Sequence, residues 1–206
     1  MRIDSISQSP DRAGRYLVKF SDGSSMRLYR QTVEDFRMYP GMELEDPDAV
    51  RENNSRYSAK MRAVRIVSVS SVSKRDLESR LVRKGEGEEQ AKEAVKWLSE
   101  LNLLDDHQTA KQIVERCIHR GYGLQRAKQA LYEKQIPKSF WEEALEGYPD
   151  QTEAIADFLR TKLRDPDDPK QVKRAIDAAL RRGHSYTDVK RALEMIGSES
   201  DFEEEY

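Results

Sequence analysis

A spaced repeat of a basic residue and a glycine constrains the fold of this chain more than any other feature. Lys84-Gly85, Arg120-Gly121 and Arg182-Gly183 each end an amphipathic segment, and another amphipathic segment follows. A small apolar residue and a lysine stand six and seven positions after each glycine: Ala91-Lys92, Ala127-Lys128 and Val189-Lys190. Glycine ends helices because it adopts the left-handed backbone conformation without a steric penalty. The repeat therefore predicts an array of short helices that bury their apolar faces by stacking.

The chain from Ser73 onward has the periodicity of amphipathic helices. After residue 88, apolar residues recur at three- and four-residue spacings: Ala91, Ala94, Val95, Leu98 and Leu101. Asp105 is placed to cap the next helix, which Gly121 ends. We predict a mainly α fold in which roughly eight to nine helices form an elongated repeat domain over residues 73–197.

The first part of the chain has the pattern of short strands instead. Residues 16–20 carry β-favouring side chains, Asp22-Gly23 is a turn signal, and residues 26–29 form the answering strand. Thr32 is placed to cap a short helix that Pro40-Gly41 ends. We therefore predict a small β-rich N-terminal domain over residues 1–56.

The segment at residues 57–72 is ambiguous. Its β-branched residues favour a strand: Val64, Ile66, Val67, Val69 and Val72. A helical stripe can also be drawn through it: Ala59, Ala63, Ile66, Val67 and Ser70. We predict a helical connecting segment.

Charge is distributed unevenly, although the formal net charge is only −2. Cations outnumber carboxylates between Lys170 and Leu193, whereas residues 198–206 form an acidic tail without a cation. Opposite charge blocks predict a basic binding face and a solvated tail. The candidate partner-binding residues are Arg126, Lys128, Lys173, Arg174, Arg181, Arg182, Lys190 and Arg191. We treat Arg182 and Lys190 as exposed cations and Leu180 as a core residue; an ordinary solvated helix surface is the alternative for the whole set.

Catalytic and metal-binding patterns are missing from the sequence. A single cysteine, Cys117, excludes a disulfide framework and falls on an apolar helix stripe. His184, Ser185 and Asp188 have the spacing of capping residues, and no phosphate loop or nucleophile motif is present. No apolar run approaches the roughly 20 residues of a membrane-spanning helix. We expect a soluble, cytoplasmic, non-enzymatic protein without a metal or a cofactor.

Three segments resemble, in order and spacing, segments of the RecX family. They read SKRDLESRLVRKG at residues 73–85, ERCIHRGYGLQRAKQALYEKQI at 115–136 and LRRGHSYTDVKRAL at 180–193. The resemblance covers about residues 71–196, and the N-terminal region is more weakly similar to the β-rich extension of longer members. Departures from the usual family residues fall at packing or cap positions: Val72, Thr109, Ala127, Gln135 and His184.

The resemblance implies tandem three-helix repeats and a monomer that binds the RecA nucleoprotein filament on single-stranded DNA. It further implies that binding limits filament extension, ATP hydrolysis and strand exchange. The small net charge and the lack of a long apolar run predict that there is no membrane partner. A basic helical-repeat module that binds single- or double-stranded DNA directly is the alternative.

Overall fold

The computed structural model describes residues 1–11, 14–163, 165 and 168–203, with side chains through residue 197. Contacts divide the chain into two compact units. Unit 1 comprises Met1–Ser70 and Lys74–Leu104, and unit 2 comprises Ser71–Ser73 and Asp105–Tyr206. Among the described helices, none is long and apolar enough to cross a lipid bilayer.

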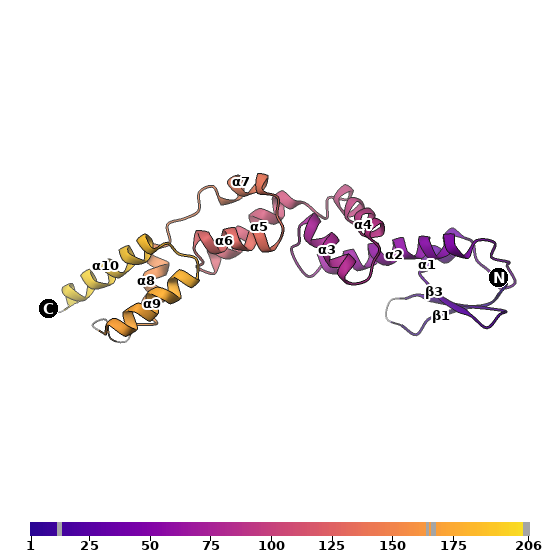
Figure 1. Ribbon diagram of the computed structural model, residues 1–206, viewed down its shortest axis with the longest axis horizontal. Coiled ribbons are helices and arrows are strands. Elements are labelled where there is room, and N and C mark those ends of the chain that lie inside the picture. Colours follow the sequence, from indigo (N-terminus) through magenta and orange to yellow (C-terminus); the bar gives the residue numbers. More distant parts are fainter. Residues whose placement is uncertain (12–13, 164, 166–167, 204–206) are drawn as a thin grey trace. The chain divides into compact units, whose positions relative to one another are not determined.

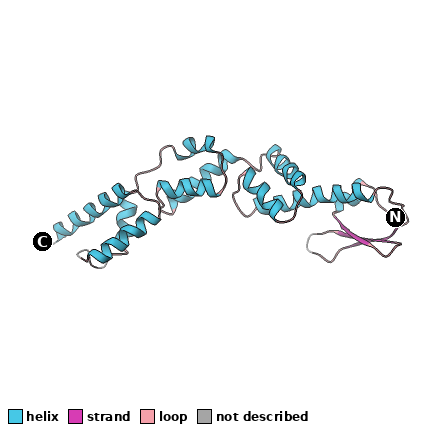
Figure 2. Cartoon of the chain, in the orientation of Figure 1, coloured by secondary structure: helices cyan, strands magenta, loops and turns pink. Residues whose placement is uncertain are grey.

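Unit 1 begins with an antiparallel sheet (Figure 2), whose strands are neighbours in the order of the sequence. Its strands are β1 (Ile3–Gln8), β2 (Tyr16–Phe20) and β3 (Ser25–Leu28). Gly23 has a φ of 83° between β2 and β3, which confirms the predicted turn. One face of the sheet contributes to a buried cluster: Ile3, Val18, Phe20, Leu28, Met38, Leu44 and Val50.

Two helices follow the sheet, α1 (Arg30–Asp35) and α2 (Pro47–Val67). The prediction that Thr32 caps the short helix is wrong, because α1 begins at Arg30 and Thr32 is buried within it. The helical interpretation of the 57–72 segment is confirmed through Val67. Its helix begins earlier, where the Asp46 side chain accepts hydrogen bonds from the first-turn amides and Pro47 occupies the first turn.

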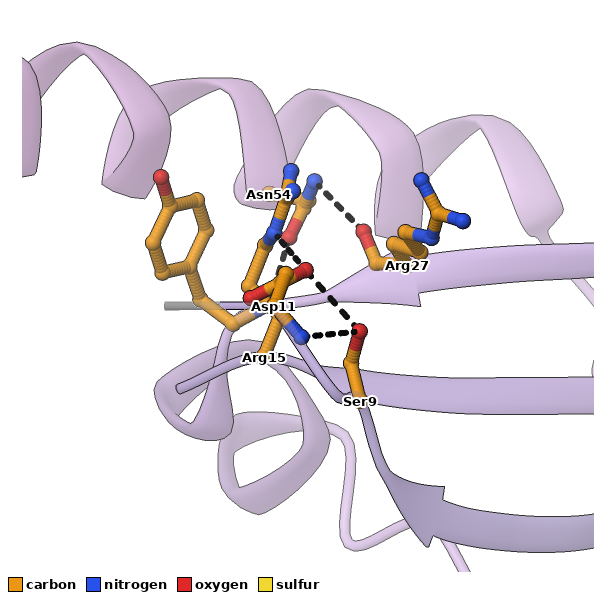
Figure 3. A network of polar contacts seen from close by, with 6 residues as sticks. Ser9, Asp11, Arg15, Arg27 and Asn54 are labelled. Atoms are coloured by element: carbon orange, nitrogen blue, oxygen red, sulfur yellow. Dashed lines mark hydrogen bonds and ion pairs between the residues drawn. The ribbon is translucent and has the colours of Figure 1, made fainter. Parts of the chain in front are cut away.

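The side chain of Asn54 fixes α2 to the edge of the sheet (Figure 3). Its Oδ1 accepts a 2.8 Å hydrogen bond from the Tyr29 amide, and its Nδ2 donates to the Arg27 carbonyl at 3.5 Å. A carboxamide can replace a neighbouring strand here because it offers both a donor and an acceptor. A second network in the same figure joins Ser9, Asp11 and Arg15, with the Arg15 Nε–Asp11 Oδ2 distance at 2.9 Å.

The remainder of unit 1 is a three-helix set, in which α2 packs with α3 (Lys74–Arg83) and α4 (Glu88–Glu100). Gly85 has a φ of 90° in the turn between α3 and α4. The nearly buried carboxylate of Glu86 fastens this turn to α2: Arg62 Nε lies at 2.6 Å and Ser58 Oγ at 3.0 Å. Ala59 and Ala63 lie on the buried face of α2, where their small side chains allow close packing between helices.

Unit 2 contains two further three-helix sets (Figure 1). The second set comprises α5 (Asp106–His119), α6 (Leu124–Glu133), a short 3₁₀ turn η1 (Lys138–Phe140) and α7 (Trp141–Leu145). The third comprises α8 (Thr152–Arg160), α9 (Pro169–Arg181) and α10 (Tyr186–Glu203). Each set has its own buried apolar cluster. The predicted fold class, three-helix repeats preceded by a small sheet, is therefore confirmed.

Of the remaining predictions about the fold, one is confirmed, one is wrong and others stay untested. Asp105 caps α5 as predicted, since its side chain accepts from the amides of His107 and Gln108. The prediction that Leu180 is a core residue is wrong, because the residue is 38% exposed. The side chains of the acidic tail, residues 198–206, lie outside the described residues. The domain boundaries at residues 56, 72 and 197 stay predictions.

Candidate partner-binding surface

The basic-residue–glycine turns of the second and third sets meet backbone to backbone in unit 2. The Gly123 amide donates to the Arg182 carbonyl at 3.0 Å, and the Gln125 amide donates to the Gly183 carbonyl at 3.2 Å. The carboxyl end of α9 therefore satisfies free amides at the amino end of α6, so that ends of opposite dipole sign meet. Gly183 has a φ of 87° and Gly121 a φ of 61°, as the predicted helix ends require.

The Arg182 side chain belongs to this junction. Its Nη2 donates to the Arg120 carbonyl at 2.6 Å, and its guanidinium lies 4.6 Å from the Phe158 ring centroid and 5.2 Å from that of Tyr122. The prediction that Arg182 is an exposed cation is wrong, because the guanidinium caps the end of α5 and stacks on aromatic rings.

His184 is buried beside Arg182, with its Nε2 at 3.1 Å from the Gly121 carbonyl oxygen. Burial is the largest cause and lowers the pKa of His184; the hydrogen bond to Gly121 opposes it, the Arg182 charge lowers the pKa further, and the Asp188 charge has the smallest, opposing effect. The neutral ring with a proton on Nε2 is therefore the form that donates to Gly121. Ser185 Oγ bonds both the Asp188 carboxylate and the Asp188 amide, which confirms capping chemistry here.

The Tyr148 hydroxyl links the loop after α7 to the turn after α5. It donates to the Tyr122 carbonyl at 2.6 Å. Burial is the main cause that raises the pKa of Tyr148 to about 12. The tyrosine therefore stays protonated at neutral pH and acts as a hydrogen-bond donor.

Three predicted binding cations lie on the exposed face of α9: Lys173, Arg174 and Arg181. Ala175 and Ala179 are buried on the other face of the helix. None of the three cations forms an ion pair with any residue that the structure describes. Exposed Asp177 lies on the same face, so this face of α9 keeps a net positive charge that is available to a partner.

The other predicted cations are engaged or partly covered. Lys190 lies 3.7 Å from Glu194, and Arg191 lies 3.5 Å from Asp150, with all four side chains largely exposed. Arg126 pairs with Glu133 at 3.0 Å. Lys128 is half-buried on α6. Exposed pairs of this kind are weak, so Lys190 and Arg191 can exchange their partners for others.

Sequence reasoning missed one further feature, a groove of about 150 Å³ between α5 and α6. Arg116 and Arg120 line it, with Cys117 between them on the same stripe of α5. The i, i+4 spacing of the two arginines is the only local signal for it. Burial raises the pKa of the Cys117 thiol despite the nearby cations, so the thiol is not an activated nucleophile.

The chemistry of these surfaces is suited to binding anionic groups. Within the described part of the chain, no cluster of three or more His, Cys, Asp and Glu side chains is placed to hold a metal ion. Arginine and lysine side chains on rigid helices instead offer charged donors to carboxylates or phosphates.

Comparisons with known proteins agree with this architecture. A family model described as RecX, second three-helix domain, matches residues 105–145, which coincide with the second helix set. Regulatory protein RecX of Chlorobaculum tepidum is 30% identical over 153 residues, covering 72% of this chain and 95% of that protein. Regulatory protein RecX of Vibrio parahaemolyticus is 27% identical over 139 residues, covering 66% and 90%.

Solved structures share the fold. A crystal structure of regulatory protein RecX aligns with a TM-score of 0.63 at 19% identity, covering 94% of this chain and 98% of that one. The structure of RecX from Lactobacillus salivarius aligns with a TM-score of 0.59 at 19% identity, covering 70% and 98%.

Proposed function

The chain belongs to the RecX family of regulatory proteins, and we propose that it regulates the RecA recombinase by binding the RecA filament on single-stranded DNA. In this proposal, binding limits filament extension, ATP hydrolysis and strand exchange, and the chain itself performs no catalytic step. The proposal places the protein in the cytoplasm, acting as a monomer. The match to the Chlorobaculum tepidum protein over 95% of its length carries the proposal, because it spans a whole RecX chain rather than one motif.

The exposed cations of α9 support a binding role for the third helix set. Lys173, Arg174 and Arg181 are solvated and outside ion pairs among the described residues, and Lys190 and Arg191 on α10 are held only by exposed carboxylates. Such cations steer a charged partner and raise the association rate. Arg182 contributes by holding the second and third sets together rather than by contacting the partner.

The ATPase activity of RecA on single-stranded DNA tests the proposal. We expect the whole 206-residue chain to slow hydrolysis at substoichiometric amounts, because one bound molecule can block subunit addition for many subunits. Unchanged hydrolysis at molar excess and low salt, with circular dichroism showing a folded protein, overturns the inhibitory role.

Direct binding to nucleic acid is the second candidate. Tyr186 and Lys190 are both exposed and stand four positions apart on α10, so a base-stacking ring and a phosphate-binding cation share one helix face. Fluorescence anisotropy with labelled single- and double-stranded oligonucleotides, without RecA, separates the two candidates. Tight binding with a steep salt dependence favours direct DNA recognition.

A further inference from the structure

The groove between α5 and α6 is built from one stripe of each helix. α5 contributes Ile113, Arg116, Cys117 and Arg120, whose spacing places them along a single face. α6 contributes Ala130, Glu133 and Lys134, and Tyr122 lines the groove as well. Its volume of about 150 Å³ is small enough for a single bulky side chain rather than an extended polymer.

The rim of the groove is positive. Arg116 and Arg120 are exposed, and neither forms an ion pair with a described residue. The Arg116 Nε donates to the Gln112 carbonyl at 3.0 Å, which holds the guanidinium close to the helix and does not use its terminal nitrogens. Glu133 is the one carboxylate among the described lining residues, and Arg126 at 3.0 Å and Gln129 at 3.2 Å already bind it.

The floor of the groove is apolar. Ile113 is 4% exposed and Cys117 6% exposed, and Ala130 adds a half-buried methyl group. An apolar floor between two arginines matches a ligand that combines a bulky apolar group with flanking carboxylates, since arginine binds carboxylates through paired hydrogen bonds. A nucleic-acid strand instead needs a cationic track with exposed aromatic platforms.

We propose that the α5–α6 groove binds a segment of a partner protein in which a bulky apolar side chain is flanked by acidic residues. The proposal goes beyond the proposed function, because it names a site and a ligand chemistry that hold whether or not RecA is the partner. The cations of α9 steer the encounter, and the groove supplies the anchor.

Cys117 provides a reporter for the groove, since it is the only cysteine of the chain and lies on the floor. The test measures the rate at which neutral monobromobimane labels Cys117 in the whole 206-residue chain, with and without the peptide acetyl-Glu-Glu-Phe-Glu-Glu-amide. At a peptide concentration of twice its Kd, labelling slows about threefold if the peptide covers the thiol. The uncharged peptide acetyl-Gln-Gln-Phe-Gln-Gln-amide is the matched control and leaves the rate unchanged.

A second measurement keeps the test decisive if the thiol reacts too slowly in the folded protein. Anisotropy of the labelled acidic peptide gives its Kd directly, and Arg116→Gln with Arg120→Gln should weaken binding at least about tenfold. Arg83→Gln is the matched control, because Arg83 is exposed on α3 and its Nε donates to the carbonyl four residues earlier, as that of Arg116 does.

Each alternative result rejects the proposal. Equal protection by both peptides indicates an apolar pocket without selection for carboxylates. Protection by a single-stranded oligonucleotide and not by the acidic peptide assigns the groove to nucleic acid. If neither method detects binding of the acidic peptide, the groove does not bind this class of ligand. RecA is absent from both measurements, so their failure would not affect the proposed function.

Discussion

Gly123 and Gly183 lie so close that a methyl group on Gly123 would overlap the carbonyl of Gly183. Gly183 is also closely packed, since a methyl group on it would overlap the backbone of Arg126. Gly183 needs glycine for its positive φ as well, whereas Gly123 has a φ of −75° that any residue adopts. The absence of a side chain at Gly123 therefore serves the contact between the second and third helix sets.

Gly123→Ala should lower the free energy of unfolding of unit 2 by about 2–4 kcal/mol, because the backbones must separate and lose hydrogen bonds. Gly87→Ala is the matched control: Gly87 also stands at a helix N-cap with an extended backbone, but its new methyl group meets only the flexible end of Gln90. Gly87→Ala should lower the free energy of unfolding of unit 1 by about 0.5–1 kcal/mol.

Urea unfolding measures the difference. In a Trp97→Phe background, Trp141 is the one tryptophan left and reports on unit 2. For Gly87→Ala, in unit 1, Trp141→Phe leaves Trp97 as the reporter. Equal losses in the two variants contradict a special role for the Gly123 contact.

Arg182→Ala should lower the stability of unit 2 by about 1–3 kcal/mol, because a hydrogen bond to a carbonyl and two ring contacts are lost. Arg181→Ala, at the adjacent exposed position, should change it by no more than about 0.5 kcal/mol. Arg182→Lys should not restore stability, since an ammonium group lacks the planar face that stacks on Phe158. Thermal melting followed at Trp141 checks all three variants, and identical melting of Arg182→Ala and Arg181→Ala rejects the structural role.

Local signals explain what could be predicted from the sequence. The sequence predicts the helix ends at Gly85, Gly121 and Gly183 because a positive φ at a helix end is a property of a few neighbouring residues. It predicts the cap at Asp105 for the same reason. The ambiguous segment is helical through Val67 because Asp46 and Pro47 start α2 and its alanines pack, which outweighs the strand propensity of its β-branched residues.

Contacts between distant residues explain what could not be predicted. Nothing near Arg182 in sequence indicates that its guanidinium meets Phe158 and the Arg120 carbonyl. Leu180 continues the stripe of Val172 and Ile176. The buried face of α9 is instead formed by Ala175 and Ala179, because small residues allow closer helix packing. The α5–α6 groove depends on two helices at once, so one periodic pattern cannot reveal it.

His184 should make unit 2 less stable in acid. Its pKa in the folded protein lies below the ordinary value of 6.5, so the unfolded chain binds the proton more tightly. The stability is therefore complete above pH 6.5 and falls as the pH decreases from 6.5 toward the folded pKa. His184→Gln should remove this part of the pH dependence while keeping a donor for Gly121.

Urea midpoints between pH 7.5 and pH 5, which bracket the ordinary pKa of histidine at about 6.5, measure this effect. His119→Gln is the control, since its imidazole is exposed on α5 in the same unit. A pH profile of His184→Gln that matches the wild type assigns the acid sensitivity to other groups.

Removal of the α9 cations tests the partner-binding surface. The triple variant Lys173→Gln, Arg174→Gln and Arg181→Gln should bind the RecA filament several-fold more weakly at low salt, mainly through a slower association rate. The difference should shrink above physiological ionic strength, where charges more than about 8 Å apart are screened. Melting should change by no more than about 0.5 kcal/mol per substitution, because all three side chains are exposed.

A second triple variant removes the same charge elsewhere: Arg65→Gln, Arg83→Gln and Lys96→Gln, all exposed in unit 1. Because net charge alone affects long-range steering, the association rate should fall somewhat in both variants. Only the α9 variant should lose several-fold in affinity for the filament. Surface plasmon resonance on immobilised filaments gives the association rate and the dissociation rate separately. Equal losses in the two triple variants mean that net charge, rather than the α9 face, governs the encounter, and the partner contact must then be sought at the α5–α6 groove.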